Sequence, residues 1–196
     1  MRTFLTCIFL LLWACGTDEI PTDFRAFPLQ QAGVIVKLQQ DFVEIAPADY
    51  KQLMSHSDWS EAVKQAQHRT IDRFFTKFPE ARLLIDTTAL ERLAFVVPVG
   101  FPYLDINADN AELMAKAYLE QEEEEQDDNN TVWRRVTQKE DFAYIRLTIK
   151  KESEQSTRFF NHYIISTADH TFGLSFSTPD DVHYQGYVDQ TERIAR

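Results

Sequence analysis

The chain has 196 residues, a net charge of −11 at pH 7 and two cysteines, Cys7 and Cys15. This length suits one domain of ordinary size with an additional tail. Because the acidic balance repels phosphate and no run of basic residues offsets it, we expect no nucleic-acid partner and no attraction to anionic lipid head groups. The charge instead favours solubility or a cationic partner.

The first fifteen residues have the organisation of a secretory signal. Arg2 precedes an apolar run from Phe4 to Trp13, which is too short to span a bilayer as a helix. The segment 12–15, Leu-Trp-Ala-Cys, resembles the lipobox of bacterial lipoproteins, although Trp13 stands where a small residue is usual. In that family the cysteine is lipidated and becomes the first mature residue. The resemblance therefore implies a signal peptide at 1–14 and lipidation of Cys15, the alternative being an ordinary signal peptide or a short anchor.

Lipidation of Cys15 would fix the protein to a membrane, since two or three acyl chains anchor stably where one is marginal. With Cys7 removed, the mature domain would have no free thiol, no internal disulfide, no cysteine nucleophile and no zinc site built on cysteine. Gly16 stands where aspartate signals inner-membrane retention in bacterial lipoproteins, which implies transport to the outer membrane. The pair at 18–19, Asp-Glu, resembles an acidic tag for surface export, and a polar tether is the alternative. Periplasmic and surface display both remain open.

Residues 15–32 show no sustained periodicity and predict a flexible tether after the anchor. A single globular domain is expected at 33–196. Its first elements are short β-type runs at 34–38 and 42–45, which predict a hairpin closed by Pro47.

Two helices are predicted from capping boxes. Asp58 and Glu61 open the first, and a wide aromatic stripe up to Pro79 indicates packing on a sheet rather than a ligand site. Asp109 and Glu112 open the second. The β-branched runs between these helices, at 82–85 and 93–97, are typical of strands buried on both faces.

An acidic run at 120–128 follows the second helix. Carboxylates at a helix C-terminus oppose the macrodipole and repel one another, so we expect the helix to fray there into a solvated loop. A calcium site is the alternative, but the spacing does not match the EF-hand loop and no glycine permits its turn.

The last third of the chain alternates between strands and short turns. Runs at 131–136, 142–150, 158–167 and 171–177 predict a four-stranded antiparallel meander. Ile164, on a central strand, is expected in the core. Thr178, Pro179 and Asp181 have the spacing that opens a C-terminal helix. The residues expected on its inward face are Tyr184, Tyr187, Val188, Thr191, Ile194 and Ala195.

These elements together predict an α+β fold, an antiparallel meander sheet with helices packed on it. The segments 42–47, 159–165 and 172–176, followed by a predicted terminal helix, are similar to PsbP-like and DcrB-like domains. The similarity is one of element order over most of 33–196. It implies an α/β/α sandwich with an accessory or binding role outside the cytosol, and no known reaction.

No motif for catalysis is found. The glycines are scattered, which excludes a phosphate loop or dinucleotide fingerprint, and neither G-x-S-x-G nor H-E-x-x-H occurs. His162 and His170 flank a predicted turn and could form a weak metal site or an acid–base pair, or else two solvent-facing residues. Five aromatic residues could offer a binding surface if they point outward: Trp133, Tyr144, Tyr163, Tyr184 and Tyr187.

The sequence therefore predicts a non-enzymatic lipoprotein of the bacterial envelope, anchored by lipid to a membrane, that binds a protein partner or supports an assembly. Cys15 is its one assigned site residue, and no catalytic, cofactor or metal residue is assigned. A small-ligand carrier with a pocket between sheet and helices is the alternative, followed by a hydrolase using scattered Asp and His residues. Neither the partner nor the oligomeric state can be read from the sequence.

Overall fold

The computed structural model describes residues 22–101, 104–123, 129–152, 157–167, 170–182 and 184–194. The predicted signal peptide, Cys15 and part of the acidic run at 120–128 lie outside the described residues. Within the described part of the chain, no helix is long and apolar enough to cross a membrane.

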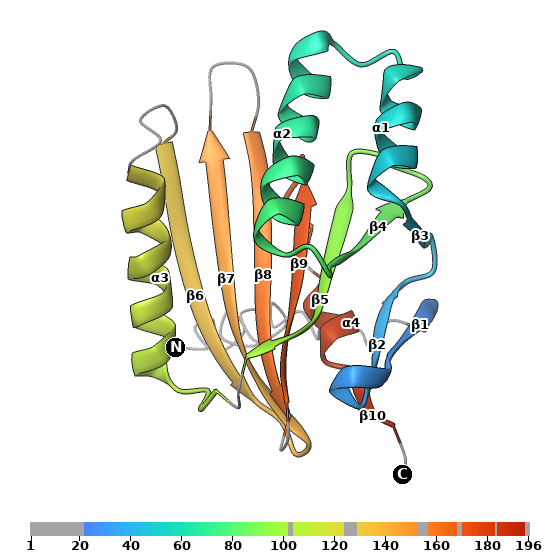
Figure 1. Cartoon of the computed structure of the whole chain (residues 1–196). Coiled ribbons are helices and arrows are strands. Elements are labelled where there is room, and N and C mark those ends of the chain that lie inside the picture. The colour runs from blue at the N-terminus through green and yellow to red at the C-terminus, as the bar shows by residue number, and fades with distance from the viewer. Residues whose placement is uncertain are drawn as a thin grey trace, which may run out of the picture.

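The main sheet is antiparallel and is built from β3 (Phe42–Ile45), β4 (Arg82–Asp86), β5 (Leu93–Phe101), β6 (Asn129–Gln138), β7 (Phe142–Glu152), β8 (Thr157–Thr167) and β9 (Thr171–Thr178). The strand order is β3-β4-β5-β9-β8-β7-β6 (Figure 1). Strands β6 to β9 are the predicted four-stranded meander, which is confirmed. Because β9 pairs with β5, the meander continues the sheet begun by β3, β4 and β5.

One face of the main sheet, here called the helical face, carries α1 (Pro47–Ser55), α2 (Glu61–Lys77) and α3 (Ala108–Glu123). Helices α1 and α2 pack over β4 and β5, where Leu83, Ile85 and Phe95 meet Ile71. Helix α3 packs over β6 and β7 through Ala111, Ala115 and Met114, which contact Ile145, Leu147 and Ile149. The helices thus cover the two sides of the sheet and not its middle (Figure 1).

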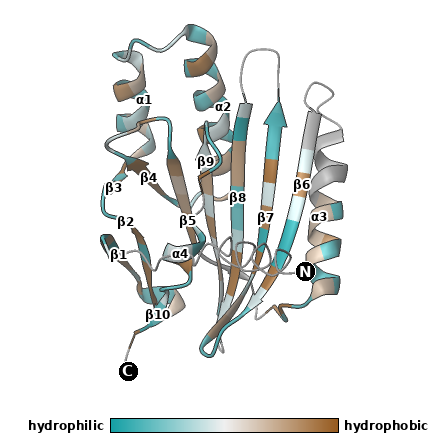
Figure 2. Ribbon diagram, turned by 180° about the vertical axis from the view of Figure 1, so that it is seen from behind, coloured by the Kyte–Doolittle hydropathy of each residue, from teal (hydrophilic) through white to brown (hydrophobic). Residues whose placement is uncertain are grey.

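The opposite face carries a second, smaller sheet of β1 (Phe24–Leu29), β2 (Val34–Gln39) and β10 (Glu192–Arg193), together with the 3-10 turn η1 (Gln30–Ala32) and the short helix α4 (Gln185–Val188). Figure 2 views the molecule from this side and shows hydrophobic residues in brown along β2 and β5. Alternating residues of the main sheet, such as Leu84 and Ile165, join this layer in the largest apolar cluster. The α+β class with helices packed on a sheet is therefore confirmed. In the described residues this second layer consists mainly of strands, where the α/β/α sandwich implied by the resemblance would have helices.

The N-terminal prediction is wrong in two respects. Strands β2 and β3 follow one another but form no hairpin, because β2 pairs with β1 and β3 pairs with β4. The tether predicted at 15–32 is too long, since β1 lies within it and Leu29 is buried. Gly33, with φ of 62°, adopts the left-handed conformation that turns the chain from η1 into β2.

The predicted helix boundaries also need correction. Pro47 is the first residue of α1, a helix that the sequence pattern did not indicate. Helix α2 is capped by Ser60, whose Oγ accepts a hydrogen bond from the Val63 amide at 3.3 Å, so Asp58 is not the cap. Helix α3 begins one residue before Asp109, with Asn107 Oδ1 accepting from the Asn110 amide at 2.8 Å.

The predicted C-terminal helix is largely absent from the described residues. Strand β9 continues through Thr178, whose hydroxyl donates to the Asp180 carbonyl at 2.6 Å, and only the four residues of α4 are helical. Tyr184, Val188 and Thr191 are nevertheless buried, as their predicted inward stripe requires. The chain then ends as β10 on the edge of β2.

Candidate ligand-binding cleft

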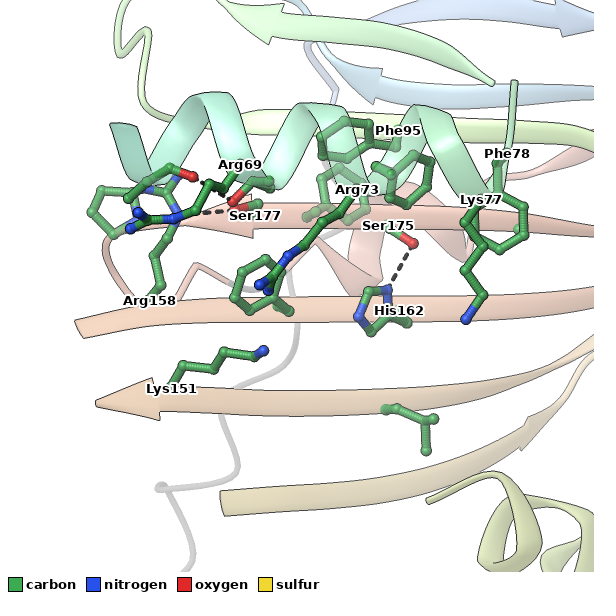
Figure 3. Close-up of a pocket in the computed structure, with 18 of the residues that line it drawn as sticks. Arg69, Arg73, Lys77, Phe78, Phe95, Lys151, Arg158, His162, Ser175 and Ser177 are labelled. Carbon is green, nitrogen blue, oxygen red and sulfur yellow. Dashed lines mark hydrogen bonds between the residues drawn. The ribbon is translucent and has the colours of Figure 1, made fainter. Parts of the chain in front are cut away.

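A cleft of about 1020 Å³ opens on the helical face between α2 and α3. Its walls are α2 on one side, and Met114 and Ala117 of α3 on the other. Its floor is formed by β5, β9, β8 and β7 (Figure 3). The cleft exists because the helices cover only the two sides of a wide sheet, so that its central strands are left open.

The floor of the cleft is made by side chains that alternate along β8 and β9. Phe160, His162 and Ile164 of β8 face the cleft, and they pair in register with Ser177, Ser175 and Gly173 of β9. The β9 residues are small, which deepens the cleft beneath α2. A Cβ atom added at Gly173 would meet Val97 at 3.5 Å, an ordinary contact, so the glycine leaves space that a side chain could fill.

The cleft has two unlike ends. At one end, here called the cationic end, Lys151 and Arg158 pair across β7 and β8, and Arg69 of α2 lies above them (Figure 3). At the other end, here called the apolar end, Val97 and Ile164 line the floor, and Phe78 lies at the end of the α2 wall beside Lys77. Leu147, Phe95 and Phe74 adjoin this end at the level of His162. Charge is therefore concentrated toward one end of the floor.

Arg158 is held in the cleft by two hydrogen bonds. Its Nε donates to Ser177 Oγ at 2.9 Å and its Nη2 to the Glu91 carbonyl at 2.6 Å (Figure 3). Burial lowers the pKa of Arg158 from its ordinary value, while the charges of Glu91 and Tyr50 act in the opposite direction. The guanidinium is thus a desolvated positive charge fixed by two neutral hydrogen-bond acceptors.

Helix α2 adds a row of cations along the wall. Arg69, Arg73 and Lys77 recur every four residues on one face of the helix, over about 12 Å. The Lys77 ammonium lies 5.7 Å from the centre of the Phe78 ring. Among the described residues that line the cleft, Glu91 is the single acid. The sequence has no run of basic residues, but the fold brings cations from α2, β7 and β8 together in the cleft.

His162 lies at the middle of the floor and forms a hydrogen bond with Ser175, with 2.7 Å between Nδ1 and Oγ (Figure 3). Its ring stacks on Phe160 at a centroid distance of 6.2 Å, and the Lys151 ammonium lies 5.6 Å from the Phe160 ring centre. His170 is exposed at the turn after β8 and is separated from His162 by the end of that strand. His162 and His170 therefore do not form the site that was one alternative, and only His170 fits the other, a solvent-facing residue at the turn.

The predicted aromatic surface is not formed by the tyrosines. Tyr144, Tyr163 and Tyr184 are buried in the core on the opposite side of the main sheet. Trp133 is half exposed, and Tyr187 is partly buried. Within the described residues, no group of three histidine, cysteine or acidic side chains could hold a metal ion. Cys15 lies outside the described residues, and its lipidation stays a prediction.

Comparison with protein-family models and with curated proteins finds no match for the chain. The resemblances to lipoprotein signals and to PsbP-like or DcrB-like domains accordingly remain predictions.

Proposed function

We propose that this protein is a lipid-anchored envelope protein that carries a small, partly apolar ligand in the cleft between α2, α3 and the main sheet. The observation that supports the proposal is the cleft itself, whose volume of about 1020 Å³ is at the upper end of the range typical of ligand sites. A mainly apolar lining with a few convergent polar groups is also typical of such sites. The cleft favours a small-ligand carrier over a role that needs only a protein partner.

Hydrolysis is a second candidate, since the bond between Ser175 and His162 has the length expected of a nucleophile and its base. A triad also needs an acid that orients the base. Glu91, the only acid among the described lining residues, lies at the cationic end beside Arg158. Binding is therefore the better supported function. It predicts that the wild-type protein and Ser175→Ala hydrolyse p-nitrophenyl esters equally slowly, whereas a hydrolase would lose its turnover in the variant.

The lipid anchor is tested by Cys15→Ala. We expect this variant to leave the membrane fraction, or to keep its signal peptide, because the acyl chains that hold the mature chain to the bilayer have no attachment point. Membrane fractionation and intact-mass measurement report both outcomes. Cys7→Ala is the matched control and should fractionate as the wild type, since cleavage removes residue 7. Equal membrane retention of the Cys15 variant would refute the anchor.

The cleft is tested by Gly173→Leu in the mature chain without its lipidated cysteine, residues 16–196, which contains every described element. We expect the leucine to fill the apolar end and to weaken binding of the fluorescent probe 8-anilinonaphthalene-1-sulfonate about tenfold, or about 1.4 kcal/mol. Fluorescence titration measures the affinity, and a melting curve reports the fold. Because an added Cβ makes only an ordinary contact there, the melting temperature should change little.

Thr76→Leu is the control for this experiment, because Thr76 is exposed on α2 and does not line the cleft. Its probe affinity should equal that of the wild type. If both leucine variants bound the probe as the wild type does, the dye would be bound elsewhere and the cleft would not be a ligand site.

A further inference from the structure

The floor of the cleft changes character along β8. Arg158, Phe160, His162 and Ile164 face the cleft in turn, over about 20 Å of strand. This order runs from a guanidinium, through an aromatic and imidazole centre, to a branched hydrocarbon. A ligand that lies along β8 therefore contacts charged side chains near one end of the floor and apolar side chains near the other.

The cationic end suits an anionic group. Arg158 and Lys151 come from neighbouring strands and Arg69 from the helix above, so three elements direct positive charge to one place. Guanidinium and ammonium groups bind carboxylate and phosphate through charge-assisted hydrogen bonds. The hydrogen-bond acceptors of Arg158 are a hydroxyl and a carbonyl, and the charge of Glu91 favours the guanidinium without a side-chain hydrogen bond to it. A bound anion would add a charge-assisted hydrogen bond to this desolvated group.

The apolar end suits a hydrocarbon. Ile164 lies on an interior strand of the sheet, yet it is only partly buried, whereas its neighbour Ile165 on the other face is fully buried. Gly173, in register with Ile164, leaves room above the floor. An apolar surface left open in the middle of a sheet is typical of a binding site.

We propose that the ligand is a single-chain amphiphile with an anionic head group, bound with its head at the cationic end and its hydrocarbon chain at the apolar end. The proposal rests on the carrier function, because it names the ligand class for the same cleft. An acidic peptide is the competing occupant, because Arg69, Arg73 and Lys77 extend positive charge along the α2 wall. The amphiphile is favoured by the floor, where the cations are at one end and the other end is apolar. A carboxylate and a phosphate head are both compatible with the cationic end.

The test is calorimetric titration of residues 16–196 with dodecanoate, dodecyl phosphate, dodecanol and acetate. We expect the better of the two anionic amphiphiles to bind at least about tenfold more tightly than dodecanol, and acetate not to bind. Comparison of dodecanoate with dodecyl phosphate distinguishes a fatty acid from a phosphate-headed lipid. Hexaglutamate, which has charge without a hydrocarbon chain, represents an acidic peptide.

Variants at the two ends of the cleft distinguish the contribution of the ligand's head group to binding from that of its hydrocarbon chain. Arg158→Met should weaken binding of the anionic amphiphile about tenfold and leave dodecanol unchanged, and Arg158→Lys should retain most of the affinity. Lys151→Met gives the same test if Arg158→Met does not fold. Ile164→Ser should weaken both ligands alike. Arg135→Met, which removes a cation from the exposed opposite side of β6, should change neither.

Each contrary result has a distinct meaning. Equal affinity for dodecanol and the anionic amphiphiles, unchanged in Arg158→Met, would overturn the anionic head and leave the carrier function intact. Tighter binding of hexaglutamate would overturn the amphiphile in favour of an acidic peptide. Binding of the fluorescent probe without binding of any amphiphile would reject this ligand class. Failure of the probe and of every ligand would reject the carrier function itself.

Discussion

Replacing Ile165 by aspartate should cost about 4 kcal/mol of the free energy of unfolding, a large part of the stability of an ordinary domain. Ile165 is fully buried between Tyr144 on β7 and Phe172 on β9, in the cluster that joins the two sheets. A carboxylate there would be buried among apolar and aromatic side chains and would also forfeit the packing of the isoleucine. Urea denaturation followed by far-UV circular dichroism measures the loss.

Ile164→Asp is the matched control, one residue away on the same strand. Ile164 faces the cleft and is only partly buried, so water can solvate the new carboxylate and we expect a loss of about 1 kcal/mol. The prediction that Ile164 lies in the core is therefore wrong, and Ile165 is the core residue instead. Equal losses for the two variants would mean that both faces of β8 are equally covered, and the cleft would then not be open in solution.

The strands of the meander were predictable because their signal is local. In β7 to β9, alternating apolar residues and short turns fix both the strand and its neighbour, since a tight turn leaves little choice of pairing. The buried runs around Leu84 and Phe95 were likewise identified as strands, but the sequence did not show that β5 pairs with β9. That pairing joins residues about eighty positions apart, and no local pattern encodes it.

The N-terminal errors have the opposite cause. Two β-type runs separated by Gln40 and Asp41 are typical of a hairpin, yet here each strand has a better partner elsewhere. Strand β2 pairs with β1 over six residues, and this pairing buries Phe27 and Leu29 against the main sheet. The choice is made by tertiary burial, which outweighs the local turn preference.

The cleft was hidden from the sequence for a related reason. Its cations fall in two groups, at 69–77 and at 151–158, that are far apart in the sequence, and the overall charge of −11 conceals them. The recurrence of Arg69, Arg73 and Lys77 at helical spacing was the one local signal of a cationic face. The meeting of Arg158 with Lys151 depends on strand register, and the open floor depends on how far apart α2 and α3 pack, neither of which a single sequence reveals.

Replacing Arg92 by methionine should cost about 3 kcal/mol of the free energy of unfolding. Arg92 Nη1 lies 3.5 Å from Oδ2 of Asp86, a carboxylate that is fully buried and whose Oδ1 accepts hydrogen bonds from the amide and hydroxyl of Thr88. Methionine keeps the apolar stem but removes the counter-charge, which leaves the buried carboxylate poorly compensated. Chemical denaturation of the variant and the wild type at neutral pH measures the difference.

Asp180→Asn separates this buried interaction from the exposed one that the same arginine makes. Asp180 Oδ2 accepts from Arg92 Nη2 at 2.7 Å and raises the pKa of Arg92, but half of the Asp180 side chain is exposed. An exposed ion pair contributes less than about 1 kcal/mol, so we expect Asp180→Asn to be nearly neutral. The double variant Arg92→Met/Asp86→Asn should recover part of the loss, because no buried charge then remains. If Arg92→Met cost no more than Asp180→Asn, the two Thr88 hydrogen bonds alone would hold the Asp86 carboxylate, and Arg92 would serve only to fasten the segment after β9.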